Sequence, residues 1–184
     1  MAAIKVNPTR MELKRLKGQL ATARRGHKLL KDKCDELMRR FLDAVREAKE
    51  LREKLSVTLG DVDGRFSIAA AQTDPRMMTA ALMLPAGGGE LSVGEENIMS
   101  VIVPRYDFSY DKGKSASPYG FAFTTSALDL ATDELTDVLP ELVHLAQLEK
   151  TSLLLCDEIE RTRRRVNALE YIMIPQYEVQ IKEI

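Results

Sequence analysis

Apolar and small residues recur along the first third of the chain at alternating steps of three and four. They are Leu13, Leu16, Leu20, Ala23, His27, Leu30, Cys34, Leu37, Phe41, Ala44, Ala48, Leu51 and Leu55. An a/d heptad pattern held for about six repeats is typical of a coiled coil. The run from Asn7 to Glu12 favours a helix start, because Pro8 needs no amide donor there and Thr9 and Glu12 are spaced to cap each other's backbone N–H groups. The pattern therefore predicts one long helix beginning near Thr9.

A second run with the same spacing occupies the last part of the chain. Its members are Leu145, Leu148, Ser152, Leu155, Ile159, Thr162, Val166, Leu169 and Met173. Pro140 is tolerated in a first helical turn, so we expect this helix to start between Leu139 and Glu141, with Pro175 as a candidate bend. A helix as long as the first needs a partner helix to lie against. A connection within the same chain favours antiparallel pairing, and an ordinary helical bundle is the alternative.

The middle of the chain differs in kind, because glycine and proline interrupt it repeatedly. Short helices are predicted at 76–84 and 127–138, and the triple glycine at 87–89 is expected to be a flexible loop. Residues 98–103 and 106–110 have strand character, with a turn predicted at 117–120. The fold class is therefore mainly α: N-terminal and C-terminal helices (1–59 and 139–184) form a long antiparallel two-helix coiled coil, and an irregular middle region (60–138) contains a short β-hairpin.

Composition agrees with an elongated helical protein. The chain has 184 residues, 45% hydrophobic and 30% charged, and no Trp. No apolar run approaches the roughly 20 residues needed to span a bilayer, and the N-terminus lacks a signal peptide's apolar core, so we expect a cytosolic chain. The net charge of -1 hides an asymmetry. Residues 1–31 carry nine basic residues and one acidic residue, a net +8, whereas residues 60–140 carry five basic and twelve acidic residues, a net -7.

Catalytic chemistry finds little support in the sequence. Gly113-Lys114-Ser115 resembles the end of a phosphate loop, but Phe108 stands where the first glycine is required. The two histidines, His27 and His144, stand far apart on predicted helices. Cys34 and Cys156 lack metal-ligand spacing, so reduced thiols are expected, and a side hypothesis is that they face one another across the seam. No catalytic, cofactor-binding or metal-binding residue is predicted.

Basic residues remain the main candidates for binding. They decorate the first helix at Arg10, Lys14, Lys17, Arg24, Arg25, Lys28 and Lys31, and the last helix at Arg161, Arg163, Arg164 and Arg165. Solvated helix faces are the plainest interpretation of each residue, but the concentration of charge in residues 1–31 indicates a negatively charged counterpart. Nucleic acid is one option, although this end lacks aromatic residues for stacking on bases. An acidic protein surface is the other.

Several segments resemble one family over nearly the whole chain and in the same order. These are residues 6–13, 26–33, 97–99, 103–104, 163–170 and 174–175. They are similar to the D subunit of the V-type and A-type ATPases and ATP synthases. The chain departs from that family at Cys34, where a long polar residue is usual, and at Ile184, beyond which the family continues into a basic tail.

The resemblance implies a non-catalytic rotor shaft, cytoplasmic and peripheral to the membrane, with no cofactor. The implied partners are the hexamer of catalytic A and B subunits, the F subunit of the central stalk, and the stalk-base subunit that links to the ion-carrying membrane ring, with no direct nucleic acid contact and no membrane insertion. Candidate hexamer contacts are Arg10, Lys14, Lys17, Arg24, Arg25, Lys28, Arg161, Arg164 and Arg165. The F subunit is expected along 42–55 and 139–154. A free-standing coiled-coil adaptor and a nucleic-acid-binding helical hairpin are the alternatives.

Overall fold

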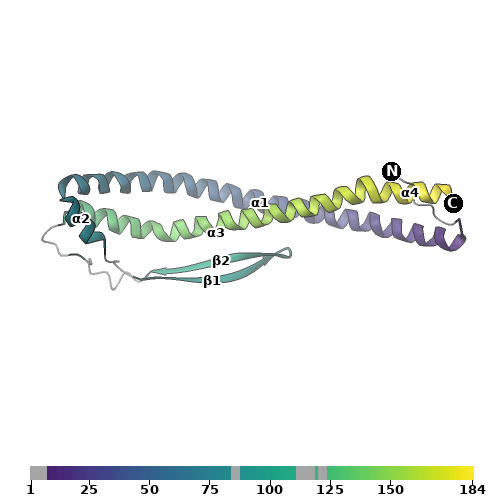
Figure 1. The fold of residues 1–184 in the computed structure, drawn as a ribbon, viewed down its shortest axis with the longest axis horizontal. Coiled ribbons are helices and arrows are strands. Elements are labelled where there is room, and N and C mark those ends of the chain that lie inside the picture. The colour runs from purple at the N-terminus through teal and green to yellow at the C-terminus, as the bar shows by residue number, and fades with distance from the viewer. Residues whose placement is uncertain (1–7, 84–87, 111–118, 120–123) are drawn as a thin grey trace. The chain divides into compact units, whose positions relative to one another are not determined.

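The computed structural model describes residues 8–83, 88–110, 119 and 124–184 (Figure 1). The elements in chain order are α1 (Arg10–Gln72), α2 (Pro75–Leu82), β1 (Gly89–Ile98), β2 (Val101–Tyr110), α3 (Ser126–Ala168), the π-helical segment η2 (Leu169–Met173) and α4 (Ile174–Glu183). The chain divides into two compact units. We call Met1–Leu42 with Leu153–Ile184 the terminal unit, and Asp43–Ser152 the central unit. No described helix has both the length and the apolar character that a membrane crossing requires.

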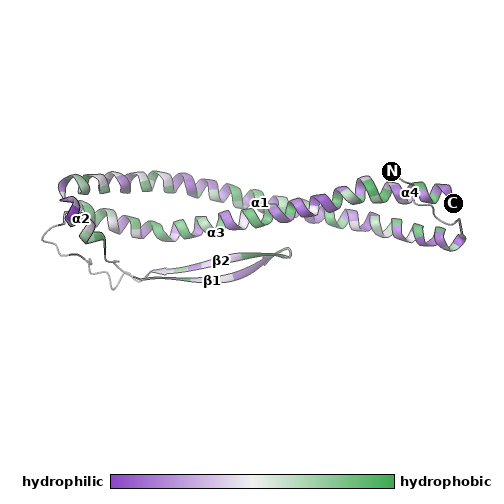
Figure 2. Ribbon diagram, viewed as in Figure 1, coloured by the Kyte–Doolittle hydropathy of each residue, from purple (hydrophilic) through white to green (hydrophobic). Residues whose placement is uncertain are grey.

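In the terminal unit, the first part of α1 packs antiparallel against the end of α3. The helix begins as its capping residues predict, with the Glu12 N–H donating to Thr9 Oγ1 at 3.3 Å. Ion pairs join the two helices across the seam, as between Lys33 Nζ and Glu158 Oε1 at 3.2 Å. The seam itself is buried at Leu16, Ala23, Leu37, Leu155, Ile159, Thr162 and Val166. Hydrophobic residues recur along both helices, alternating with hydrophilic ones (Figure 2).

In the central unit, the rest of α1 packs antiparallel against the start of α3. Leu55, Val62 and Ala69 are buried on α1 at steps of seven residues. These three residues occupy the first core position of the heptad, called a, whereas Leu16 and Leu37 in the terminal unit occupy the second core position, called d. A 3.6-residue helix drifts by about 20° per heptad relative to a strict 3.5 repeat, which accounts for the shift in the most buried position. The mainly α fold with paired terminal helices and a central hairpin is thus confirmed.

Helix α1 runs past the predicted end at residue 59 and continues to Gln72. The prediction ends the helix at Gly60 and Gly64, since each glycine costs about 1 kcal/mol relative to alanine in a helix. Both glycines lie on the exposed side, while Val62 and Ala69 continue the buried seam. Packing of those two residues outweighs the local penalty.

Helix α3 begins at Ser126 and contains Pro140, so the predicted start between Leu139 and Glu141 is wrong. Proline inside a helix removes one hydrogen bond and costs about 3 kcal/mol. Leu128 and Val138 before the proline and Leu148 after it are all buried. Continuous packing on both sides of Pro140 therefore holds the helix together, and the short helix predicted at 127–138 is its first part.

Helix α2 agrees closely with the helix predicted at 76–84. Asp74 caps it, accepting a hydrogen bond from the Arg76 N–H at 2.8 Å, and Pro75 occupies the first turn. Met78 and Ala81 of α2 join Ala69 and Leu128 in a small core at the end of the central unit. This core fastens α2 to the two long helices.

The β-hairpin is longer than the sequence indicates. Its turn lies at Met99 and Ser100, inside the segment predicted to be one strand, and both residues have positive φ, 53° and 74°. Two such residues form the type I′ turn that joins antiparallel strands most tightly. Of the first strand, Gly89–Ile98, only the last residue falls in a segment predicted to be a strand. The predicted turn at 117–120 lies outside the described residues except for Tyr119.

A π-helical segment, rather than a simple bend, precedes Pro175. The Ile174 N–H donates to the Leu169 carbonyl, one residue further back than in an α-helix. Proline cannot donate to the carbonyl four residues before it, and its ring clashes with that carbonyl in a regular helix. The wider turn moves the carbonyl away, and the helix continues as α4.

Candidate interaction surfaces

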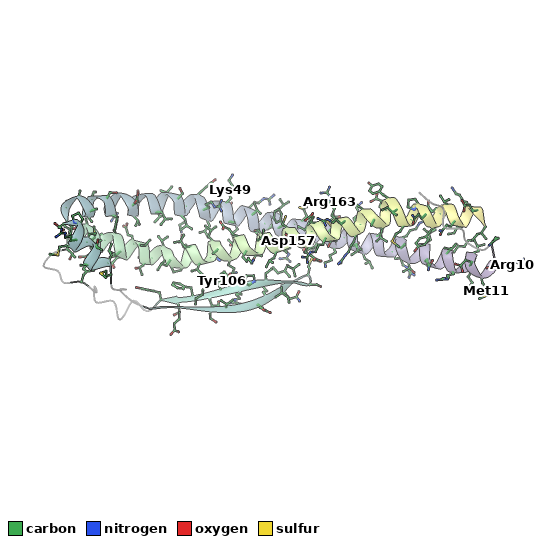
Figure 3. The ribbon with its side chains drawn as sticks, viewed as in Figure 1. Arg10, Met11, Lys49, Tyr106, Asp157 and Arg163 are labelled. Carbon is green, nitrogen blue, oxygen red and sulfur yellow. The ribbon has the colours of Figure 1, made fainter. Side chains whose placement is uncertain are left out.

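Exposed cations follow one side of α1 through the terminal unit. They share steps of three, four and seven residues, which keeps them on one helix face beside the seam. We call this set the basic stripe: Arg10, Lys14, Lys17, Arg24, Lys28 and Lys31. Figure 3 shows Arg10 at the start of this helix, next to Met11. Arg25 is also exposed, and its Nε donates to the Ala21 carbonyl of its own helix at 3.4 Å.

The cations of α1 differ sharply in their pairing before and after Lys33. From Lys33 onward, all eight basic residues of the helix form an ion pair with an acidic residue. Of the eight before Lys33, only Arg15 and Arg24 have an acidic partner among the described residues, Glu12 and Glu178. The other six are Arg25 and five members of the basic stripe, and no described acid neutralises their charge.

The arginines near the end of α3 are exposed as well. Arg164 pairs with Glu160 one turn earlier on the same helix. Arg161 and Arg165 lie one turn apart and make no ion pair with a described residue. Arg163, labelled in Figure 3, also projects from the helix. The nine candidate hexamer contacts are thus all on the surface of the terminal unit, six on α1 and three on α3.

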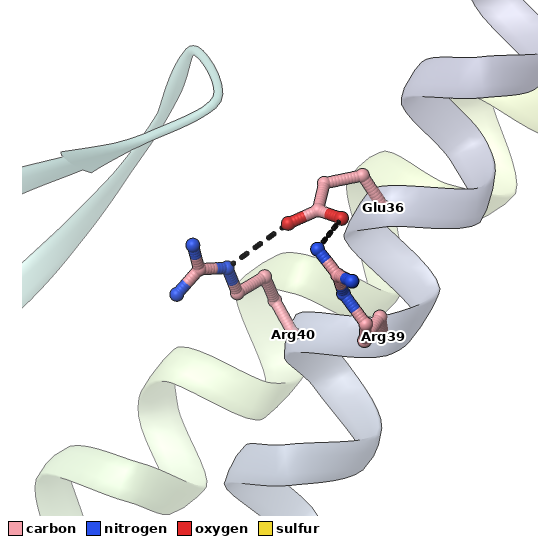
Figure 4. A network of polar contacts seen from close by, with 3 residues as sticks. All are labelled: Glu36, Arg39 and Arg40. Carbon is pink, nitrogen blue, oxygen red and sulfur yellow. Dashed lines mark hydrogen bonds and ion pairs between the residues drawn. The ribbon is translucent and has the colours of Figure 1, made fainter.

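Glu36 is an acid of α1 that pairs with two arginines of the same helix. Its two carboxylate oxygens accept hydrogen bonds from Arg39 and Arg40 on the next turn (Figure 4). The hydrogen bond from Arg39, reinforced by the charges of both arginines, holds the pKa of Glu36 below the usual value of a glutamate. Both guanidinium groups have a local counter-charge and offer little to a partner.

The histidines and cysteines form no reactive group among the described residues. His27 lies 3.2 Å from Glu170 and His144 lies 3.1 Å from Glu47, so each histidine joins two helices within its own unit. Both thiols are free, and Cys156 is exposed on α3 rather than turned into the seam. The idea that the two thiols face one another is therefore not supported. No described His, Cys, Asp and Glu side chains gather in a group that would hold a metal ion.

Apolar side chains are exposed along the long helices where the F subunit is expected. Leu42 and Val45 lie three residues apart on α1, and each is more than a third exposed. On α3, Leu153 is 56% exposed. Exposed apolar residues repeated at helical spacing are typical of a surface that another protein covers.

An apolar surface at the end of the central unit is absent from the sequence-based expectations. A cavity of about 260 Å³ opens there between α1, α2 and α3, lined by Leu59, Val62, Phe66, Leu82, Ala131 and Leu135, with Asp63 and Thr132. Met77, Leu82, Met83, Leu130 and Leu135 are exposed in the same unit. Sequence patterns assign α2 and the start of α3 to an irregular region, and nothing in them indicates that the two share a surface.

Known proteins resemble this chain along almost its full length. The family model described as the D subunit of ATP synthase matches residues 12–184. The chain belongs to the ATP synthase D subunit family. The V-type ATP synthase D subunit of Acetivibrio thermocellus is 55% identical over 186 residues, covering all of this chain and 84% of that protein. The D subunits of Clostridioides difficile and Enterococcus faecalis are each 50% identical, over 100% and 97% of this chain and 83% and 85% of those proteins.

Membership of the D subunit family confirms the resemblance drawn from the sequence segments. The chain is a central-stalk subunit of a V-type rotary ATPase, which decides against a free-standing adaptor and a nucleic-acid-binding hairpin. The family assignment does not name the residues that meet each partner.

Proposed function

We propose that this D subunit is a non-catalytic shaft, which couples ATP turnover in a hexamer of A and B subunits to rotation of a membrane ring. The observation that carries the proposal is the pairing of charge along α1. Six cations before Lys33 have no acidic partner among the described residues, whereas every later cation of the helix has one. Unpaired charge concentrated at one end fits a face turned toward an acidic surface of another subunit.

The same charges suit a moving contact. Exposed ion pairs are worth about 0–1 kcal/mol each and are screened by salt, so a set of them attracts without locking one geometry. A shaft must favour different conformations of the hexamer at different angles, which requires contacts that differ between those conformations. Two unlike helices, one carrying the basic stripe and one carrying Arg161 and Arg165, supply such an asymmetry.

The other partners are assigned to the exposed apolar surfaces. The F subunit would cover α1 and α3 around 42–55 and 139–154, where Leu42, Val45 and Leu153 are exposed. A stalk-base subunit would meet the end of the central unit, where Leu82 and Leu135 line the cavity and Met77 and Met83 are exposed on α2 and just after it. Methionine adapts its shape readily, which suits a joint between subunits. In this arrangement the chain works on the cytoplasmic side, peripheral to the membrane.

Reconstitution tests the proposal directly. The chain, the F subunit and the purified A/B hexamer are mixed, and co-elution and ATPase activity are measured at increasing salt. We expect a stoichiometric complex with altered turnover. Absence of a complex at moderate salt contradicts the proposal.

A pair of matched variants tests the role of unpaired charge. Lys17→Gln with Lys28→Gln removes two cations of the basic stripe, and Arg39→Gln with Arg40→Gln removes two cations that have a local acid. The first variant is expected to bind the hexamer more weakly and with a shallower salt dependence, and the second to bind like the unmodified chain. Equal weakening by both variants would show that total charge, rather than the basic stripe, matters.

A further inference from the structure

The register of the β-hairpin determines which backbone N–H and C=O groups of each strand point away from the other strand. Tyr106 pairs with Val93, and the Tyr106 N–H donates to Gln147 Oε1 of α3 at 2.8 Å rather than to β1. Tyr106 and Val93 are therefore a non-hydrogen-bonded pair, in which both residues turn their backbone groups outward. Pro104, two residues earlier on β2, has no N–H to give and fits the same alternation.

The alternation gives β1 an outer edge of known composition. Non-hydrogen-bonded pairs alternate along the strand, so they include Leu91, Val93, Glu95 and Asn97 of β1. The N–H and C=O groups of these four residues point away from β2. No described residue makes a hydrogen bond to these backbone groups. The strand is ten residues long, and its pairing with β2 continues without interruption to the turn.

The two edges of the hairpin differ in how far the rest of the central unit covers them. On the β2 edge, the Tyr106 N–H is bonded to Gln147 of α3 within the central unit, Tyr106 is half-buried, and Val101 and Val103 are buried. Along β1, all residues except Gly94 and Ile98 are exposed. Strand edges in proteins are commonly protected by charged side chains, especially lysine, or by proline, a bulge or a covering element. Among the described residues, β1 has no lysine, proline, bulge or covering element, and its three glutamates repel only a partner that is itself acidic.

Side chains of β1 indicate what could pair with it. Leu91 and Val93 are 52% and 62% exposed and lie on one face of the strand. Glu90, Glu95 and Glu96 are its only charged residues, so the strand carries three negative charges and no positive one. A second copy of the strand would place acids against acids, which disfavours self-pairing. A segment with lysine or arginine between apolar residues would match both features.

We propose that the outer edge of β1 is a docking site for an extended, basic segment of another subunit, which pairs with it as a third strand. The main chain of that segment would satisfy the outward groups of Leu91, Val93, Glu95 and Asn97, and its cations would meet the glutamates. The inference rests on the proposed function, because the partner is a neighbour in the assembled ATP synthase. It adds a backbone-mediated contact to a protein otherwise expected to use helix surfaces.

Hydrogen exchange at single amides tests this pairing. The exchange of residues 90–98 is measured in the isolated chain and in the assembled complex. In the isolated chain, amides of odd-numbered residues exchange fast and those of even-numbered residues, which bond to β2, exchange slowly. In the complex we expect at least about tenfold slower exchange at residues 91, 93 and 95. Unchanged exchange at these amides in a complex that has assembled overturns the inference and leaves the proposed function standing, whereas failure to assemble contradicts both.

A matched pair of variants separates the backbone from the side chain. Val93→Pro removes one outward N–H without touching the bonds to β2, and Val93→Thr keeps both the N–H and the branched shape. We expect Val93→Pro, but not Val93→Thr, to lose the protection at residues 91 and 95 and to dissociate from the complex about tenfold faster. The even-numbered amides of the free variant report whether the hairpin is intact. Equal behaviour of the two variants overturns the inference.

Discussion

Thr162 offers a direct test of how the seam is stabilised. It lies between Ile159 and Val166 on the buried face of α3, and its side chain is fully enclosed, with 0% exposure. Its hydroxyl has no hydrogen-bond partner among the described residues. Replacement by valine exchanges that hydroxyl for a methyl group of nearly the same size. We predict that Thr162→Val stabilises the protein.

The expected gain in stability equals the cost of burying the Thr162 hydroxyl without a hydrogen-bond partner. A buried hydroxyl without a partner costs about 1–3 kcal/mol, and valine and threonine have similar helix propensities, so nothing offsets the removal of this cost. The free energy of unfolding should therefore rise by about 1–2 kcal/mol. In a chain of this length, 1 kcal/mol corresponds to roughly 2–4 °C in Tm.

Urea unfolding followed by circular dichroism at 222 nm measures the change, with two controls. Thr162→Ser keeps the hydroxyl and loses a buried methyl group, and should destabilise by about 1 kcal/mol. Thr22→Val makes the same substitution at an exposed residue whose hydroxyl donates to the Gly18 carbonyl at 3.0 Å, and should stay within about 0.5 kcal/mol of the unmodified chain. If Thr162→Val unfolds at the same or lower urea concentration, the hydroxyl is satisfied and the reasoning fails.

Three further predictions concern other parts of the fold. Gly60→Ala and Gly64→Ala should each raise the unfolding free energy by about 0.5–1 kcal/mol, because no described atom lies within 4 Å of the added Cβ; a loss of stability in the same urea assay would contradict this. Met99→Asn combined with Ser100→Gly should relieve about 1 kcal/mol or more of strain from two positive φ angles and slow amide exchange in the hairpin, so faster exchange would refute it. Glu36 should titrate below an ordinary glutamate in a carboxyl-detected NMR titration, and glutamine in place of both its arginines should raise the midpoint. The pKa of Glu36 is lower in the folded protein than in the unfolded chain. Its ion pairs therefore contribute to stability above the pKa that Glu36 has in the unfolded chain, and this contribution disappears as the pH falls through its pKa in the folded protein. A midpoint equal to that of an ordinary glutamate would contradict the pairing.

The long helices were predictable because their signal is repeated many times. A seam of three-four steps from Leu13 to Leu55 leaves little room for another structure, and Thr9 marks its start. Their ends were not predictable, since they depend on packing between distant segments. Pro140 looks like a helix start when only neighbours are considered, but Val138 and Leu148 are buried on either side of it.

The hairpin escaped full prediction for a different physical reason. Its turn uses Met99 and Ser100, which do not favour positive φ, so the sequence lacks the Asn-Gly signal of a type I′ turn. Strand β1 contains Gly89 and Gly94 and three glutamates, all of which are depleted in strands. Pairing with β2, whose Val101 and Val103 are buried, overrides these local preferences.

The sequence shows where basic residues are in excess, and the structure shows which of them have an acidic partner. The sequence shows that residues 1–31 carry an excess of eight positive charges, but an excess can be neutralised by acids on a facing helix. From Lys33 onward every cation of α1 has an acidic partner: four pair with acids of α3, as Lys54 does with Glu141 at 2.6 Å, and four pair with acids of α1 itself. Before Lys33 the facing segments supply only Glu178 of α4, to Arg24, and Glu170 of η2, to His27, among the described residues. The helix pair thus neutralises its own charge where it must hold itself together and leaves charge uncompensated where, on the proposed function, another subunit provides the acids.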